Sequence, residues 1–269
     1  MIEQLLPAPI RARLKTALKR RLRRHGYSLV PTSPGGSSLP SWDIWNWVVR
    51  SGDFRTVIDI GANDGSYVGY LNKTFRPDRI LAFEPLPSCQ AKLRSLQSEL
   101  PNLHVFDLAL DEREGAQTFF ENSYGPASSL LHVSGLSKRA FPETEGERAL
   151  TVQLARLDDV LDAADLARDV FIKIDVQGVE DRVIRGGRAV FSAATLVLVE
   201  MSFAPMYDGQ PLFEEVHDLL VGCGLRLGGF KNQIDDVETG RPLFAHCFYW
   251  RPNERGSDGR RPDDAEAGR

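Results

Sequence analysis

The sequence predicts an α/β fold of the doubly wound type, and three observations indicate it. Short apolar runs typical of buried strands alternate with helical patterns, and two further strands close the series. A glycine-containing loop follows the first strand. Acidic residues stand at the carboxyl ends of three strands, namely Glu84, Asp175 and Glu200. Because open α/β sheets bind ligands at that edge, the sequence predicts a binding site there.

The first predicted strand and the elements after it form one unit. The apolar run Val57–Ile60 indicates a buried strand, and it leads into the loop Gly61–Gly65. A helical pattern follows over residues 67–71, and a second strand, Arg79–Phe83, ends at Glu84. Strand, glycine loop, helix, strand and terminal acid make up the half-unit with which doubly wound folds bind nucleotides.

The loop and the acid indicate what kind of nucleotide binds. Gly61 and Gly65 lack a Cβ atom, so the backbone can turn tightly and approach a ligand. A carboxylate at Glu84 can accept hydrogen bonds from both hydroxyls of a ribose. The G-x-G-x-x-G fingerprint of dinucleotide sites is missing, and Asp64 would repel a phosphate. A cationic nucleoside without phosphates, S-adenosylmethionine (SAM), therefore fits better. The alternative is a tight strand–helix turn that binds nothing.

The remaining elements follow in chain order. The predicted helices are Ser88–Leu100, Leu157–Ala167, a segment ending near Arg185, and Phe213–Val221. The predicted strands are Leu103–Leu108, Val170–Asp175, Thr195–Glu200, Leu225–Phe230 and Phe244–Trp250. Two extra strands, Ala116–Phe120 and Leu150–Leu154, flank a polar insertion, Glu121–Arg148. The insertion is long enough to form a lid over a site.

The two ends of the chain differ from the domain at residues 41–250. Residues 1–26 contain a basic amphipathic helix, because Ile10, Leu14, Leu18 and Leu22 recur every four residues. That helix, over residues 9–24, could contact an anionic membrane surface or a partner protein, or it could be a solvated helix on its own domain. Residues 27–40 have the composition of a linker. Residues 251–269 are charged and rich in Gly and Pro, which predicts a disordered tail.

Composition and charge narrow the function classes. The chain has 269 residues and carries a net charge of −4, while residues 11–24 hold eight Lys or Arg and no acid. Basic charge confined to one end argues against a nucleic-acid enzyme. The three cysteines are widely spaced, which argues against a zinc site and a disulfide framework. No apolar run has the length of a signal peptide core or a membrane span, so a cytoplasmic location is expected.

Four sequence blocks carry a family resemblance. They are Asp59–Gly65 (DIGANDG), Ala82–Pro85 (AFEP), Arg156–Leu161 (RLDDVL) and Ile172–Glu180 (IKIDVQGVE), with Glu200 as a weaker fifth element. With these blocks the chain resembles the FkbM-type methyltransferases, a branch of the class I SAM-dependent methyltransferases. The likeness covers about residues 56–200, with a family-like ending to about residue 250.

The resemblance implies a fold, a cofactor and a set of binding residues. It implies a Rossmann-like seven-stranded sheet with the last strand antiparallel, SAM as methyl donor, and a hydroxyl acceptor on a sugar or natural product. Asp59, Gly61, Asn63 and Gly65 would then line the methionine end of SAM. Glu84 would hold the ribose hydroxyls, and Asp107 to Ala109 would lie beside the adenine.

Three acids are the candidate catalytic residues. An alcohol acceptor must lose a proton, which needs a general base or a metal ion. Asp175 is the first candidate, as base, metal ligand or substrate anchor, and Glu180 and Glu200 could approach the same pocket. Paired carboxylates raise the pKa of one member, and they equally suit Mg²⁺, so Asp175 and Glu200 are also candidate Mg²⁺ ligands.

Structural alternatives exist for each candidate. Asp175 could be a helix N-cap, and Glu180 a first-turn acid that complements the helix dipole. Lys173 shares a strand face with Asp175, which indicates an ion pair. His132 in the predicted lid is a further candidate base, although a lone loop histidine is more often simply exposed.

The sequence therefore predicts a SAM-dependent O-methyltransferase that acts on a hydroxyl, with that of a sugar, glycan or glycosylated natural product as the expected acceptor. Two other classes compete. A catalytically silent SAM-fold adaptor would act through its basic N-terminal helix. A nicotinamide-dependent oxidoreductase would need the second loop glycine, which this chain lacks.

Overall fold

The computed structural model describes residues 47–49, 52–166 and 169–252. The described part belongs to a unit that starts at Trp47. The predicted basic helix at residues 1–26 and the linker at residues 27–40 lie outside the described residues, as does the predicted tail beyond Pro252.

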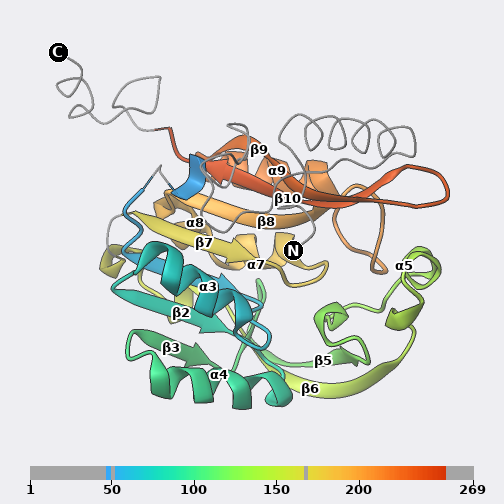
Figure 1. The fold of residues 1–269 in the computed structure, drawn as a ribbon, viewed down its shortest axis with the longest axis horizontal. Helices are drawn as coiled ribbons and strands as arrows, with labels where there is room; N and C mark the ends of the chain where they lie inside the picture. Colours follow the sequence, from blue (N-terminus) through green and yellow to red (C-terminus); the bar gives the residue numbers. More distant parts are fainter. Residues whose placement is uncertain (1–46, 50–51, 167–168, 253–269) are drawn as a thin grey trace, which may run out of the picture. The chain divides into compact units, whose positions relative to one another are not determined.

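The centre of the domain is a seven-stranded sheet (Figure 1), in the order β3-β2-β1-β7-β8-β10-β9. The strands are β1 (Thr56–Ile60), β2 (Arg79–Phe83), β3 (Leu103–Phe106), β7 (Val170–Ile174), β8 (Leu196–Ser202), β9 (Arg226–Asp235) and β10 (Pro242–Trp250). β1 pairs in parallel with β2 and β7, whereas β10 pairs antiparallel with β8 and β9. The predicted α/β sheet with its last strand antiparallel is confirmed.

Helices cover both faces of this sheet. Figure 1 shows α3 (Ser66–Phe75) and α4 (Pro87–Glu99) in front of it, and α7 (Glu180–Gly186), α8 (Arg188–Ala193) and α9 (Phe213–Gly222) behind it. Because side chains alternate along a strand, Ile58 and Ile60 join the core under α7, α8 and α9. Asp59 lies between them in sequence and therefore faces the α3 side.

Residues 109–155, which include the insertion, contain a second, three-stranded sheet at the carboxyl end of the main strands. Its order is β4-β6-β5, with β4 at Ala109–Leu110, β5 at Gly115–Asn122 and β6 at Glu147–Ala155. Between β5 and β6 lie α5 (Gly135–Ala140) and the 3₁₀ turns η2 (Gly125–Ala127) and η3 (Pro142–Thr144). Figure 1 shows these elements extending beyond β1 and β2, on the side where the predicted site lies.

The predicted helix over Leu157–Ala167 is wrong. Only Leu157–Val160 is helical (α6), and a 3₁₀ turn, η4, covers Ala163–Asp165. Asp162 explains the break, while Asp158 ties the short helix α6 to α8. Asp158 accepts hydrogen bonds from the backbone of Ala189 and Val190 at the start of α8, and the Asp162 side chain accepts one from Ala164 N. Side chains of this type offer the backbone an alternative to a continuous helix.

The predicted tail begins too early. Arg251 continues from β10, and its guanidinium donates hydrogen bonds to the carbonyls of Phe191, Ala194 and Cys223. The folded domain therefore includes Arg251.

Among the described helices, none is both long and apolar enough to cross a membrane.

Candidate functional site

A cavity of about 850 Å³ lies at the carboxyl ends of β1, β2 and β7. The loop after β1, the loop after β7 and the insertion between β5 and β6 all contribute to its lining. Its size is within the range of small-molecule binding pockets. The site that the sequence predicts at this sheet edge is therefore present as a cavity.

The glycine loop is shaped by close packing. Gly61 has φ +76°, and a Cβ there would lie 2.0 Å from the backbone oxygen of Asp175. Gly65 has φ +80°, and a Cβ there would lie 2.9 Å from Leu93 Cδ2. Both positions therefore require glycine, but the close neighbour is protein rather than ligand. Gly61 lines the cavity, whereas Gly65 packs against α4 outside the lining.

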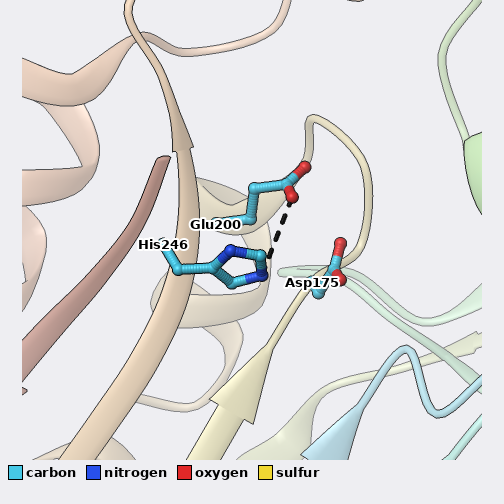
Figure 2. Close-up of side chains that lie close together, drawn as sticks. All are labelled: Asp175, Glu200 and His246. Carbon is cyan, nitrogen blue, oxygen red and sulfur yellow. Dashed lines mark ion pairs between the residues drawn. The ribbon is translucent and has the colours of Figure 1, made fainter. Parts of the chain in front are cut away.

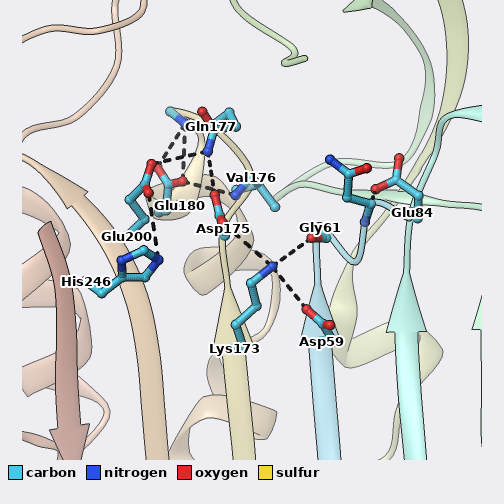
Figure 3. Close-up of polar contacts among 12 residues, drawn as sticks. Asp59, Gly61, Glu84, Lys173, Asp175, Val176, Gln177, Glu180, Glu200 and His246 are labelled. Atoms are coloured by element: carbon cyan, nitrogen blue, oxygen red, sulfur yellow. Dashed lines mark hydrogen bonds and ion pairs between the residues drawn. The ribbon is translucent and has the colours of Figure 1, made fainter. Parts of the chain in front are cut away.

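Glu84 is fixed at the end of β2 by two backbone groups. Its carboxylate accepts hydrogen bonds from Asn63 N at 2.8 Å and Leu86 N at 2.9 Å, and the side chain is buried. Both Glu84 and Asn63 line the cavity, and Figure 3 shows Glu84 at the end of its strand. Each carboxylate oxygen keeps a lone pair, so Glu84 can accept hydrogen bonds from a ligand without moving.

Asp59 lies beneath the cavity and is not part of its lining. It is fully buried and lies opposite Lys173 on the neighbouring strand, with 3.2 Å between Asp59 Oδ1 and Lys173 Nζ. Lys173 also donates to Gly61 O at 2.8 Å and lies 3.8 Å from Asp175 Oδ2 (Figure 3). Burial opposes the charge of Lys173, yet its pKa is raised because Asp59 and Asp175 stabilise the ammonium group. Asp59 therefore acts on the loop through Lys173.

Asp175 and Glu200 come together in the cavity. Asp175 follows β7, Glu200 lies in β8, and the Gln177 amide donates hydrogen bonds to Asp175 Oδ1 and Glu200 Oε1. The Tyr207 hydroxyl donates to Gln177 Oε1 at 2.6 Å, which fixes the amide orientation. Burial, and then the charge of Asp175, raises the pKa of Glu200 well above its usual value.

Glu180 braces the loop after β7. Its carboxylate accepts hydrogen bonds from Val176 N at 3.2 Å and from Gly178 N at 3.1 Å, from its place in the first turn of α7. The loop needs this support because Gln177 and Gly178 both have positive φ. Glu180 also lines the cavity, and burial raises its pKa to about 7.

The raised pKa of Glu180 predicts how stability depends on pH. The unfolded chain releases this proton near pH 4.5 and the folded protein near pH 7. The stabilisation is therefore full below pH 4.5 and is lost as the pH rises through 7. From pH 5 to pH 7, the free energy of unfolding of the unaltered protein should fall by roughly 2 to 3 kcal/mol through Glu180. Glu180→Gln has no carboxyl group at this position, so its free energy of unfolding should lack this part of the fall. Urea unfolding at both pH values measures this, and parallel losses in the two proteins would contradict it.

Three residues of the site were not among the sequence-based candidates. His246 lies opposite Glu200 in the β8–β10 pair, and Figure 2 shows its imidazole turned toward Glu200 and Asp175. Gln177 and Tyr207 join these carboxylates through the hydrogen bonds above. Only Gln177 had a signal, its place inside the block Ile172–Glu180, whereas the positions of His246 and Tyr207 depend on tertiary pairing.

Two candidates do not lie where the sequence predicts. Asp107 forms an ion pair with Arg94 at 2.5 Å and is not part of the cavity lining, while its neighbour Ala109 is. His132 in the insertion pairs with Glu147 at 3.0 Å, is half exposed, and is also outside the lining. Neither side chain lines the cavity, so the adenine role of Asp107 and the role of His132 as a base stay predictions. Leu108, Ala109 and Leu110 instead offer an apolar surface there.

The donor groups fit SAM better than a phosphate-containing cofactor. The basic side chains that line the cavity, among the described residues, are Lys92, Lys173 and His246. Lys173 is held by Asp59, and the exposed Lys92 lies 3.9 Å from Asp64, whose charge opposes a phosphate there. The carboxylates in the lining suit a cation such as a sulfonium. These groups disfavour the nicotinamide alternative.

Comparison with known proteins gives the family. Residues 59–227 match the family described as "Methyltransferase FkbM domain". The "2-O-methyltransferase NoeI" of Sinorhizobium fredii is 28% identical over 172 residues, which are 61% of this chain and 70% of that protein. The "Methyltransferase sdnD" of Sordaria araneosa is 30% identical over 154 residues, 48% of this chain and 59% of that protein.

A solved structure titled "Methyltransferase FkbM from Methylobacillus flagellatus KT" aligns with a TM-score of 0.47 and 14% identity, over 74% of this chain and 44% of that one. The family match covers more than half of this chain and includes the glycine loop, Glu84, Asp175 and Glu200. The chain belongs to the FkbM methyltransferase family and is a methyltransferase.

Proposed function

We propose that this protein is a SAM-dependent O-methyltransferase that acts on a hydroxyl group. The observation that carries the proposal is the carboxylate pair Asp175 and Glu200, which lines the same cavity as the Glu84 loop. SAM supplies an electrophilic methyl group: the new O–CH₃ bond forms as the S–CH₃ bond breaks, its electron pair returns to sulfur, and the hydroxyl proton leaves. Alignment supplies most of the acceleration, but the proton needs an acceptor.

The residues of this chain divide the work between binding and proton transfer. Glu84 and the backbone around Asn63 would orient the ribose and the methionine end of SAM. Asp175 or Glu200 would take the hydroxyl proton, and the raised pKa of Glu200 makes its carboxylate a stronger base than an exposed one. Asp175 and Glu200 would equally suit as ligands of Mg²⁺, the alternative that the sequence leaves open.

A glycan hydroxyl is the acceptor that we propose. Tyr124, Phe141 and Phe244 line the cavity on the side of the insertion and β10, where aromatic faces can pack on a sugar ring. No lysine or arginine of the described insertion, β8 or β10 lines the cavity, which disfavours nucleic acid. The 28% identical relative is named a 2-O-methyltransferase, which agrees with oxygen as the acceptor atom.

The test of this proposal uses SAM carrying a labelled methyl group and a panel of neutral methyl glycosides. We expect saturable SAM binding by calorimetry and label in an O-methyl product. Asp175→Asn should lower kcat by about 100-fold with SAM affinity nearly unchanged. Asp107→Asn is the matched control, because Asp107 also follows a strand but lies outside the lining, and it should change neither quantity. Label transferred only to nitrogen or carbon, or a folded protein that does not bind SAM, would contradict the proposal.

Two further expectations come from the sequence alone and stay proposals. One is contact with a membrane surface or a partner protein through residues 9–24, and the other is a cytoplasmic location. Deleting residues 1–26 separates a contact role from catalysis. Full activity on soluble acceptors, with weaker binding to anionic vesicles, would support a peripheral contact.

A further inference from the structure

Three potential metal ligands from three adjacent strands meet in the cavity. Asp175 follows β7, Glu200 lies in β8 and His246 lies in β10 (Figure 2). One ligand atom from each of these side chains lies within 4.8 Å of the others. Ligands of one ion at the usual distance of about 2.1 Å stand roughly 3 to 4 Å apart. The 3.8 Å between His246 Nε2 and Glu200 Oε2 lies within this range.

The imidazole of His246 has no hydrogen bond within the described part of the chain. Its Nδ1 is buried without a partner, and its Nε2 lies 3.8 Å from Glu200 Oε2, which is too long for a hydrogen bond. The unprotonated nitrogen of a neutral imidazole carries the lone pair that binds a metal ion. A metal ion between His246 and Glu200 would be coordinated by the imidazole and by the carboxylate at this separation.

The balance of charges around these ligands favours the binding of a further cation. Four carboxylates lie close together in and beneath the cavity, at Asp59, Asp175, Glu180 and Glu200 (Figure 3). The one ammonium group in this cluster, on Lys173, lies between Asp59 and Asp175 and does not lie within 4 Å of Glu200. Buried carboxylates in excess need either protons or a further cation.

A second layer of hydrogen bonds holds the carboxylates in place. The Gln177 amide donates to one oxygen of Asp175 and to one of Glu200, and Tyr207 fixes that amide. The other oxygen of each carboxylate stays free of these hydrogen bonds. Ligand carboxylates in metal sites are usually supported in this way, and the support tunes the affinity.

We propose that Asp175, Glu200 and His246 bind one divalent first-row transition-metal cation, in preference to Mg²⁺. An imidazole with two carboxylates is a mixed nitrogen and oxygen donor set, whereas Mg²⁺ prefers oxygen ligands alone. The proposal rests on the proposed function, because a divalent cation at this place lowers the pKa of a hydroxyl beside it. It also identifies His246 as the residue that selects the metal.

The test is a titration of the full-length protein, stripped with EDTA, with MnCl₂ and separately with MgCl₂. Free Mn²⁺ is followed by electron paramagnetic resonance, and heats are measured by calorimetry, without acceptor or SAM. We expect one Mn²⁺ per chain, bound at least about tenfold more tightly than Mg²⁺. His246→Gln should weaken Mn²⁺ binding by about 10- to 100-fold and leave Mg²⁺ binding nearly unchanged.

The controls separate this proposal from the proposed function. His104→Gln, at an exposed histidine of β3, should bind both metals like the unaltered protein. Glu200→Gln should weaken both metals, and thermal unfolding and SAM titration of each variant show whether it folds. A folded protein that binds SAM but binds no Mn²⁺ up to about 1 mM would overturn the metal site and leave the proposed methyl transfer intact. Unchanged Mn²⁺ binding by folded His246→Gln would overturn the role of His246.

Discussion

Glu84→Gln is expected to weaken SAM binding by at least about 100-fold, because it would remove the charge-assisted hydrogen bonds that we propose between Glu84 and two ribose hydroxyls, worth about 1.5 to 3 kcal/mol each. The substitution keeps the size of the side chain. It replaces one carboxylate oxygen by an NH₂ group, which cannot accept the backbone hydrogen bond from Asn63 or Leu86 that Glu84 accepts now. Calorimetric titration with SAM measures the loss.

Glu99→Gln is the matched control for this result, because Glu99 is exposed at the end of α4. It should bind SAM like the unaltered protein. A thermal unfolding curve of Glu84→Gln shows whether the domain is intact. Unchanged SAM affinity in folded Glu84→Gln would mean that this carboxylate does not hold the cofactor, and the ribose role would have to be abandoned.

Lys173→Met is expected to destabilise the domain by about 3 to 5 kcal/mol, because removing one partner of a buried ion pair leaves the other charge uncompensated. Asp59 is fully buried, and Lys173 Nζ is the cation beside it at 3.2 Å. The variant also loses the hydrogen bond from Lys173 to Gly61 O, so the glycine loop loses a support. The free energy of unfolding in urea measures the change.

The double variant Asp59→Asn with Lys173→Met tests the reason for that loss. It removes the isolated charge, so it should regain much of the stability that Lys173→Met loses. A double variant as unstable as Lys173→Met would show that the loss comes from packing or from the Gly61 contact. A change below about 1 kcal/mol in Lys173→Met would show that the pair contributes little.

The order of strands and helices, the glycine loop and Glu84 could be predicted from the sequence because each depends on a local pattern. Val57–Ile60 is a short, largely apolar run typical of a buried strand, and Glu84 directly follows the next predicted strand. Glu84 lines the cavity for that reason. The placement of Asp175 and Glu200 at the same edge follows from parallel strands, whose carboxyl ends meet.

Tertiary structure decided what each of these residues touches. Asp59 belongs to the same sequence block as Gly61, but the pairing of β1 with β7 directs it to Lys173 rather than to the cavity. Asp107 ends its strand as Glu84 does, yet Arg94 of α4 binds it outside the lining.

His246 shows the limit of sequence patterns most clearly. It stands within a strand of apolar and aromatic residues, and nothing near it in sequence indicates a site. Only the antiparallel register of β10 with β8 places His246 opposite Glu200. The two residues are too far apart in the chain for a local sequence pattern to connect them. The sequence by itself determined the sheet and the acids at its edge; the pairing of distant strands determined which atoms meet there, because register is a property of two segments together.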